Sequence, residues 1–287
     1  MAKSLRVLRR KIRTTESIWQ ITRAMSMVSA VQLRRVQSGV ERRREYFERL
    51  TGMLGRVSAS HGAISHPYLR ELGEQHLAGL VLAAGDRGLC GGYNGNVLRL
   101  ADGFVRNFGC EIAVIAVGAK AVAHARRNNY NMIEAYHSLK DIEDVEKASR
   151  ICRQIRGHYE ADHFDSLHVA YTKFESPSRH VPTVTQVLPI ARNRIEGTGE
   201  TEYIFEPSGP ELINTLLPMA VEAEVRYYLL QALASEHAAR MIAMTASADN
   251  AEEMRDTLIR DLNCARQHKI TSEVLEVATG AEALGHL

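Results

Sequence analysis

Proline, cysteine and long hydrophobic runs are scarce in this chain of 287 residues, which has seven prolines and four cysteines. The cysteines stand far apart, at positions 90, 110, 152 and 264. This spacing excludes a disulfide framework, and free thiols in a reducing compartment are expected. The most apolar window, residues 112–125, is interrupted by Lys120 and is too short to span a bilayer. We therefore expect a soluble protein.

The charge of the chain is nearly balanced overall but unevenly distributed. The formal net charge is +2, whereas residues 1–50 carry thirteen Lys and Arg against four Asp and Glu. That is a net +9 for the first fifty residues and leaves −7 for the remainder. Such a basic segment can bind nucleic acid, an acidic membrane surface or an acidic protein partner, or it can be the solvated face of a helix.

Residues 3–58 contain no proline and carry a hydrophobic repeat typical of a coiled coil. Its members are three or four residues apart, and all but one are apolar: Leu33, Val36, Val40, Arg43, Phe47, Leu50, Leu54 and Val57. Ahead of them, Ile18, Ile21, Met25 and Val28 keep the same spacing in another phase. The difference predicts a local change of supercoil near Gln32.

The C-terminal quarter also reads as one long helix. Between residues 211 and 284 the helix breakers are Pro218, in the first turns, and Gly280, near the end. A second stripe has the same alternating spacing, at Ile270, Val274, Val277, Ala281 and Leu284. Two striped helices at opposite ends of a chain are expected to bury their stripes on each other in an antiparallel coiled coil.

The middle of the chain alternates strand-like and helix-like segments. The strand-like segments are residues 77–84, 111–118, 165–174 and 181–190, and the helix-like segments are 95–107, 118–128 and 142–157. This alternation predicts a small α/β (Rossmann-like) domain inserted between the long coiled-coil helices, and hence an α/β fold class. We expect five segments: a helix over 1–60, a linker over 61–76, the α/β domain over 77–193, a linker over 194–210 and a helix over 211–287.

The stretch GDRGLCGGYNGN, residues 85–96, contains five glycines between a strand-like and a helix-like segment. Such a loop can point backbone N–H groups and a helix N-terminus at a phosphate. A P-loop, however, needs Lys and then Ser or Thr after its last glycine, and Asn96 and Val97 stand here. The glycines also miss the Gly-x-Gly-x-x-Gly pattern of dinucleotide sites. We interpret the loop as a tight turn, with Asp86 and Arg87 paired to each other or to the backbone.

Two further clusters contain residue types that are used in catalysis or metal binding. His158 and His163 lie among acidic residues, but their spacing fits no defined metal site and favours a solvated helix end. Ser235 and His237 are two residues apart in a helix, so their side chains diverge by roughly 200°. We therefore expect no catalytic residue, no metal and no cofactor.

Three parts of the chain carry a specific combination of motifs. They are IWQITRAMSMVSAVQLRRVQ near the start, DRGLCGGYN in the middle, and LASEHAARMIAMTASADNAEEM followed by ARQHKITSEVLEVATGAEAL at the end. In this order and spacing they resemble the gamma subunit of F-type ATP synthases. The sequence departs from the pattern of that family at Trp19 and Thr245, among other positions.

The resemblance implies a non-catalytic rotor in the central stalk, which couples ion flow to ATP synthesis or hydrolysis. Its terminal helices would turn inside a ring of three alpha and three beta subunits, and its α/β domain would lie beside the epsilon subunit and the membrane c-ring. Catalytic nucleotides would bind the beta subunits and not the glycine loop. The chain would be a peripheral membrane protein on the cytoplasmic face of a bacterial inner membrane, with no nucleic acid as partner.

The resemblance also implies contacts for individual residues. Arg266, Gln267 and Thr271, in ARQHKIT, are expected to contact the acidic lever loop of a beta subunit. Met25 is expected to face the same region from the other helix. The valines of the second stripe, at 274 and 277, are expected to pack against the N-terminal helix or the bore of the ring.

The segment YIFEP matches the foot of the family's stalk. Its residues Tyr203, Phe205 and Glu206 are therefore expected to touch the loops of the c-ring.

Two other functions fit parts of the sequence. A coiled-coil nucleic-acid-binding protein would use the basic N-terminal helix, although four glutamates, at 16, 41, 45 and 48, interrupt its basic face. A small nucleotide-dependent α/β enzyme would use the glycine loop, which lacks the phosphate-binding lysine.

Overall fold

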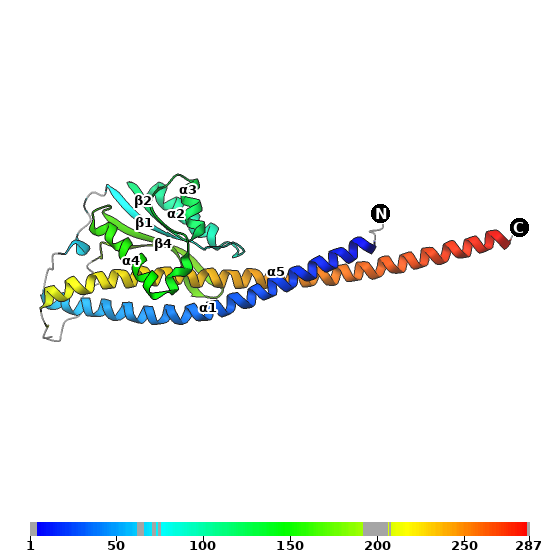
Figure 1. Cartoon of the computed structure of the whole chain (residues 1–287), viewed down its shortest axis with the longest axis horizontal. Coiled ribbons are helices and arrows are strands. Elements are labelled where there is room, and N and C mark those ends of the chain that lie inside the picture. Colours follow the sequence, from blue (N-terminus) through cyan, green and yellow to red (C-terminus); the bar gives the residue numbers. More distant parts are fainter. Residues whose placement is uncertain are drawn as a thin grey trace. The chain divides into compact units, whose positions relative to one another are not determined.

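The computed structural model describes residues 5–61, 66–70, 73, 76–191, 206 and 208–285. Its α-helices are α1 (Leu5–His61), α2 (Tyr93–Asn107), α3 (Ala119–Arg127), α4 (Val145–Glu160) and α5 (Gly209–Gly285) (Figure 1). Short 3₁₀ helices are η1 (Pro67–Leu69) and η2 (Leu139–Glu143). The strands are β1 (Leu77–Ala83), β2 (Glu111–Val117), β3 (Asn131–Tyr136), β4 (Ser166–Ser176) and β5 (Arg179–Leu188).

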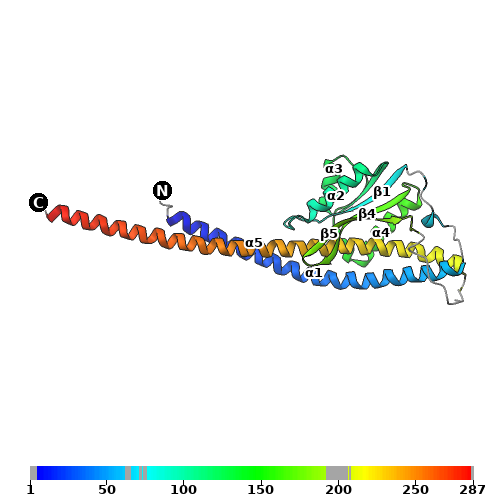
Figure 2. The same cartoon turned by 180° about the vertical axis from the view of Figure 1, so that it is seen from behind.

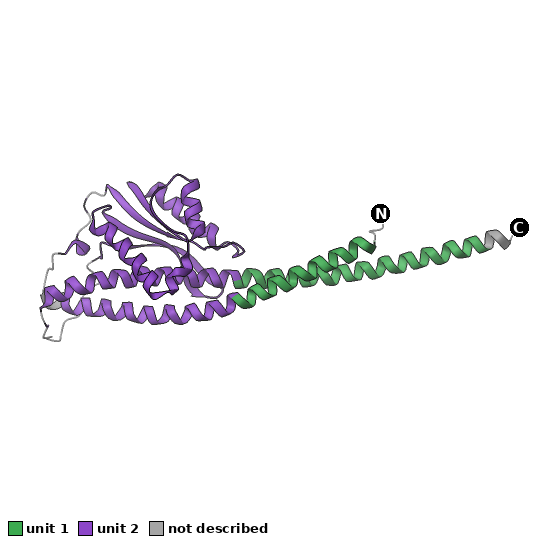
Figure 3. Cartoon of the chain, in the orientation of Figure 1, with its two compact units in different colours: residues 1–28, 241–287 green, residues 29–240 purple. Residues whose placement is uncertain are grey.

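The chain folds as two compact units, coloured separately in Figure 3. Unit 1 comprises residues 1–28 and 241–287, and unit 2 comprises residues 29–240. The long helices α1 and α5 each contribute to both units, whereas the whole sheet belongs to unit 2.

The sheet of unit 2 has the strand order β3-β2-β1-β4-β5. The first four strands are parallel, and β5 runs antiparallel to β4. Apart from their first residues, β1 and β2 are buried throughout, as expected of parallel strands that are covered on both faces. Helices α2 and α3 pack on one face, while α4 and α5 lie along the other, as Figure 2 shows from behind. The predicted α/β domain between two long helices is confirmed.

Strand β3 was not expected from the sequence. Its segment NMIEAY mixes polar and apolar residues; exposed and half-buried positions alternate over the first four residues, and the last two are half-buried. An edge strand of a parallel sheet buries only part of its surface, so it lacks the continuous apolar run that made β1 and β2 recognisable.

In unit 2, α1 and α5 run side by side, and the predicted N-terminal seam is confirmed. Leu33, Val36, Leu50, Leu54 and Val57 are buried, while the remaining members at 40, 43 and 47 are half-buried. The ring of Phe47 stacks on that of Tyr227 from α5, with centroids 6.4 Å apart.

In unit 1, the predicted phase of the α1 stripe is wrong. Ile18, Ile21 and Val28 are exposed. Met25, the fourth member of that stripe, is half-buried. The other covered positions are Leu8, Ile12, Thr15, Trp19, Thr22 and Ser26. These positions continue the heptad of the downstream seam without a shift. The sequence pattern missed them because several are small hydroxyl side chains and one is a tryptophan, which a hydrophobicity pattern does not recognise.

Contacts between the helices fix an antiparallel register in unit 1. The hydroxyls of Ser26 and Thr245 are 2.6 Å apart, and a guanidinium nitrogen of Arg255 lies 3.4 Å from a carboxylate oxygen of Glu16. In both pairs the residue numbers add up to 271, so Leu5, where the described part of α1 begins, is level with Arg266.

Beyond that level the described part of the C-terminal stripe, up to Ala281, does not pack on α1, and the side chain of Leu284 lies outside the described residues. Every residue from 266 to 281 is exposed, and Ile270, Val274 and Val277 are 52%, 61% and 73% exposed. The prediction that these residues bury themselves on the N-terminal helix is therefore wrong for the described chain. Within the described residues, no helix has an apolar stretch long enough to cross a membrane.

Candidate functional site

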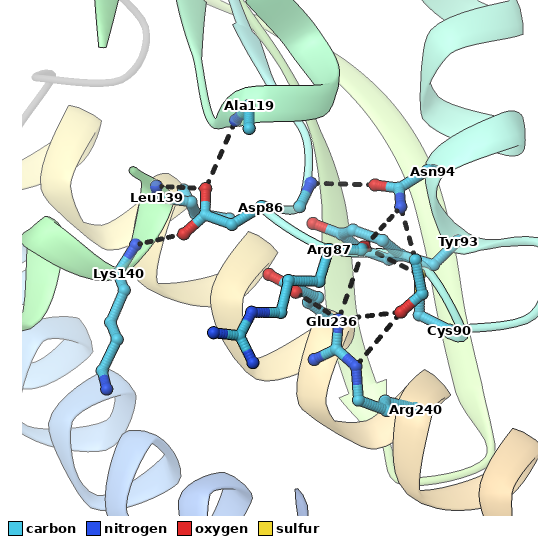
Figure 4. A network of polar contacts seen from close by, with 12 residues as sticks. Asp86, Arg87, Cys90, Tyr93, Asn94, Ala119, Leu139, Lys140, Glu236 and Arg240 are labelled. Atoms are coloured by element: carbon cyan, nitrogen blue, oxygen red, sulfur yellow. Dashed lines mark hydrogen bonds and ion pairs between the residues drawn. The ribbon is translucent and has the colours of Figure 1, made fainter. Parts of the chain in front are cut away.

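The glycine loop connects β1 to α2 and is held closed by its own polar groups (Figure 4). The backbone N–H of Gly85 donates to Oδ1 of Asn94 at 2.8 Å. The amide nitrogen of the same Asn94 donates to the carbonyl oxygen of Arg87 at 3.1 Å and approaches the sulfur of Cys90 at 3.1 Å. One asparagine thus ties both ends of the loop together.

The carboxylate of Asp86 anchors this loop to the rest of the α/β domain. Oδ1 accepts hydrogen bonds from the backbone N–H groups of Ala119, at the start of α3, and of Leu139, at the start of η2. Oδ2 accepts from the backbone of Lys140 and from the hydroxyl of Ser138. The predicted pairing of Asp86 with the backbone is confirmed. Its carboxylate provides the negative charge that the N-terminus of α3 favours.

Two charged residues of α5 hold the other side of the loop. The guanidinium of Arg240 donates to the carbonyl oxygens of Arg87, at 3.5 Å, and Gly88, at 3.4 Å. It also forms an ion pair with Glu236 at 2.5 Å. The two side chains are only 10% and 5% exposed. Burial raises the pKa of Glu236, and the neighbouring guanidinium opposes that rise.

The first glycine of the loop packs tightly against α5. A methyl group added at Gly85 would lie 2.8 Å from the carboxyl carbon of Glu236. The hydroxyl of Tyr93, the first residue of α2, donates to the carbonyl oxygen of Ala232 on α5 at 2.9 Å. The loop therefore joins the sheet to the long helix, and two carboxylates, from Asp86 and Glu236, lie beside it.

Ser235 and His237, whose residue types are used in catalysis, do not form a reactive site. Ser235 is fully buried and donates its hydroxyl to the carbonyl oxygen of Thr172 at 2.9 Å. His237 is buried as well, and burial lowers its pKa to about 4. Within the described residues, no group of three or more His, Cys, Asp and Glu side chains is arranged to hold a metal ion.

The predicted beta-lever residues lie on the exposed end of α5. Arg266, Gln267 and Thr271 are all exposed, and the hydroxyl of Thr271 donates to the carbonyl oxygen of Gln267 at 3.0 Å. Arg266 forms no ion pair with any part of the chain that the structure describes. Its guanidinium is therefore available to a partner.

The structure does not bring Met25 together with these residues. Met25 is half-buried in unit 1 and adjoins Ser26, whose partner across the helix pair is Thr245. From residue 245 to Arg266, at 1.5 Å per residue, the distance along the helix is about 30 Å. The two predicted contacts therefore belong to different levels of the helix pair.

Of the predicted foot residues, Tyr203 and Phe205 lie outside the described residues. Glu206 is described and exposed.

The charged pair that holds the loop was not recognised in the sequence. Glu236 and Arg240 are four residues apart in SEHAAR, within an Ala-rich helix. Opposite charges at this spacing inside an apolar stretch could have indicated a buried ion pair.

Comparison with known proteins places these features in a family. The family model described as ATP synthase matches residues 4–284. The ATP synthase gamma chain of Pelotomaculum thermopropionicum is 39% identical over 282 residues, covering 98% of this chain and 99% of that relative. The chain belongs to the ATP synthase gamma chain family. The gamma chain of Desulfitobacterium hafniense, at 38% identity over 281 residues, covers 98% of this chain and 99% of its own length.

Solved structures of ATP synthases share the fold of this family member. A chain of the Euglena gracilis mitochondrial ATP synthase, in the structure of its OSCP, F1 and c-ring in rotational state 3, has a TM-score of 0.64 at 16% identity. That match covers 98% of this chain and 94% of the other. A chain from the central stalk and c-ring of the Tetrahymena thermophila enzyme has a TM-score of 0.58 at 21% identity, covering 79% and 98%. The nucleic-acid-binding and small-enzyme interpretations gain no support from these comparisons.

Proposed function

We propose that this chain is the rotor subunit in the central stalk of an F-type ATP synthase. It turns inside the ring of alpha and beta subunits and couples ion flow through the membrane c-ring to ATP synthesis or hydrolysis. The chain itself is non-catalytic. The five segments expected from the sequence, with the foot over residues 194–210, are part of this proposal.

The observation that carries the proposal is the bare end of α5. Sixteen consecutive residues, 266–281, are exposed on every side, although Ile270, Val274, Leu275 and Val277 are apolar. A surrounding apolar bore would bury these side chains, each contributing about 1.5–3 kcal/mol. A shaft that ends inside a ring of partner subunits supplies that bore.

A single helix pair also suits the physical task of a rotor. Three identical catalytic subunits adopt three different conformations only if something contacts them unequally, since a partner shifts an equilibrium through differential contact energy. One antiparallel helix pair at the centre of a threefold ring has no threefold symmetry. Its rotation therefore changes the contact energy of each catalytic subunit in turn.

Two sets of residues would contact the catalytic ring at different levels. Arg266, Gln267 and Thr271 meet the acidic lever loop of a beta subunit, and Met25 contributes a second contact about 30 Å farther along the helix pair. The guanidinium of Arg266, which is exposed and forms no ion pair within the described residues, supports the first contact, because arginine offers a planar fork of donors to carboxylates.

The remaining contacts are at the membrane end of the stalk. Tyr203, Phe205 and Glu206 touch the c-ring loops, and the α/β domain adjoins the epsilon subunit. The protein is then peripheral to the cytoplasmic face of a bacterial inner membrane. It needs no cofactor and binds no nucleotide or nucleic acid, which is consistent with the use of the glycine loop as an internal connection.

Co-purification and turnover test this function. The tagged chain should be isolated from solubilised membranes together with alpha, beta and epsilon subunits. In the reconstituted complex, Arg266→Ala should lower ATPase turnover, because the lost contact is worth about 1.5–3 kcal/mol. The matched control is Arg153→Ala, which removes an exposed arginine of α4 in unit 2. Equal turnover of the two variants at equal assembly would exclude Arg266 as a lever contact, and failure to co-purify would refute the rotor assignment itself.

A further inference from the structure

Two histidines meet at the turn that follows α4. His158 lies in the last turn of the helix, and His163 lies three residues beyond its end. The backbone N–H of His163 donates to the carbonyl oxygen of His158 at 3.0 Å, and Asp162 between them has a left-handed φ of 52°. This turn brings the two imidazole centroids to 5.3 Å. A spacing of five residues, which fitted no known motif in the sequence, is thereby converted into a close pair.

The ring nitrogens of this pair are arranged in a particular way. Nδ1 of His158 lies 3.0 Å from Nδ1 of His163. Nε2 of His158 lies 2.8 Å from a carboxylate oxygen of Glu134 on β3. Because a carboxylate accepts hydrogen bonds, the neutral imidazole of His158 carries its proton on Nε2. Its Nδ1 then presents a lone pair toward His163.

We propose that His158 and His163 bind a divalent transition-metal ion, such as Zn²⁺, through their Nδ1 atoms. Two nitrogens bound to one zinc ion at about 2.0–2.1 Å would be roughly 3.3 Å apart in tetrahedral geometry and about 2.9 Å apart at a right angle. The observed separation of 3.0 Å lies within that range. To become the second ligand, His163 moves its proton from Nδ1 to Nε2, and the two rings turn slightly, because their centroids at 5.3 Å leave the two Nδ1 atoms facing each other along one line.

The surroundings match those of histidine ligands in proteins. A histidine that binds a metal commonly donates its other ring N–H to a carboxylate, which fixes the tautomer and raises the basicity of the ligand. Glu134 is placed to do this for His158. The side chain of His158 is 23% exposed and His163 is exposed, so solvent can supply the ion and fill its remaining coordination positions.

The donor set indicates which ions would bind. Imidazole nitrogens suit Zn²⁺, Ni²⁺ and Cu²⁺, whereas Mg²⁺ and Ca²⁺ require oxygen ligands. The order of stability for such ligands places Cu²⁺ above both Ni²⁺ and Zn²⁺. A bound ion would fasten the end of α4 to the turn before β4, with Glu134 linking both to the sheet edge at β3.

Metal titration of the whole chain tests the site. Untagged, chelator-stripped protein is titrated with ZnCl₂, NiCl₂ and MgCl₂ by calorimetry, and each variant is checked for folding by circular dichroism. One Zn²⁺ or Ni²⁺ per chain is expected, with no heat from Mg²⁺. His163→Gln, an exposed change, should weaken binding at least tenfold. Glu134→Gln should weaken it by about 10- to 100-fold, the usual cost of losing a carboxylate behind a ligand.

The matched control is His137→Gln, which removes another exposed histidine of the same unit and should leave the affinity unchanged. Absence of a one-to-one site in the wild-type chain would overturn the proposal and leave a hydrogen-bonded histidine pair. Binding that survives His163→Gln, or that is lost equally in His137→Gln, would also overturn it. None of these results depends on assembly into an ATP synthase, so the rotor assignment is tested separately.

Discussion

Replacing Arg240 by methionine should destabilise unit 2 strongly, although the change preserves much of the side-chain volume. The guanidinium is 10% exposed and pairs at 2.5 Å with Glu236, whose side chain is 5% exposed. The substitution removes that ion pair and the bonds to the carbonyl oxygens of Arg87 and Gly88. Removing one partner of a buried pair leaves an uncompensated charge, which typically costs about 3–5 kcal/mol. A domain with a stability of about 5–15 kcal/mol would lose a large share of it.

Most of this loss of stability comes from the carboxylate of Glu236, which is left buried without a partner, and less comes from the lost hydrogen bonds. A second substitution separates the two effects. Glu236→Gln combined with Arg240→Met removes both charges, and the double variant should regain at least half of the lost stability. The deficit of the single variant should also shrink as the pH falls. Burial already raises the pKa of Glu236, and without Arg240 the folded state binds a proton at a pH where the unfolded chain does not. That difference stabilises the folded state as the pH falls toward the unfolded pKa.

Urea unfolding followed by far-ultraviolet circular dichroism measures all three chains at pH 8 and pH 5. Hydrogen exchange of the loop residues 87–94 reports whether the loss is local to the glycine loop. If Arg240→Met costs less than about 0.5 kcal/mol, an ordinary surface value, the pair does not hold the loop. If the double variant is no more stable than the single one, the uncompensated charge is not the reason for the loss.

Four further predictions concern other parts of the molecule. Burial lowers the pKa of His168 and of His237 to about 4. The unfolded chain therefore binds protons that the folded chain does not, and each histidine should lower the stability as the pH falls below 6.5. The loss should reach about 2 kcal/mol per histidine at pH 5 and stop growing near pH 4. Unfolding at pH 7 and pH 5 of the wild type and of His237→Gln checks this. Gly118→Ala should cost at least about 1–3 kcal/mol, because the methyl would lie 1.9 Å from a backbone carbonyl oxygen at a φ of 97°. Gly103→Ala, with nothing within 4 Å, should instead stabilise α2 by about 0.5–1 kcal/mol in the same assay. Val277→Asp should leave the unfolding of the isolated chain within about 0.5 kcal/mol but impair assembly with the catalytic ring. Impaired folding of the isolated chain would show that this valine is already packed.

Much of the fold follows from signals that act locally in the sequence. The proline-free repeat predicted α1, and the continuous apolar runs of β1 and β2 predicted strands, because each pattern reflects the surface that its own element buries. Strand β3 escaped notice because an edge position requires no apolar run. Its residue Glu134 bonds to His158 on α4, a contact between elements that no local pattern encodes.

The candidate sites could be predicted only in part, for a similar reason. The residue types around the glycine loop excluded a P-loop, and the bonds from the backbone to Asp86 follow from turn chemistry. The partner of the loop, Arg240, lies 152 positions from Gly88 and is brought there by the packing of α5 on the sheet. Long-range contacts of this kind depend on tertiary packing rather than on sequence spacing.

The phase of the α1 stripe in unit 1 was predicted wrongly because a hydrophobicity pattern does not recognise the polar side chains that pack between the two helices. Inside the helix pair, Ser26 bonds to Thr245, and the guanidinium of Arg255 lies 5.7 Å from the ring centroid of Trp19. These contacts depend on geometry and bury little aliphatic surface. The apolar residues Ile18 and Ile21 face outward instead, as do those at the bare end of α5. An apolar exterior around a partly polar seam is costly for a free helix pair in water and favourable for one that is enclosed, since each side chain would contribute about 1.5–3 kcal/mol on burial. Under the proposed rotor function, the stripe that predicted the wrong seam is the surface that an enclosing ring of subunits would cover.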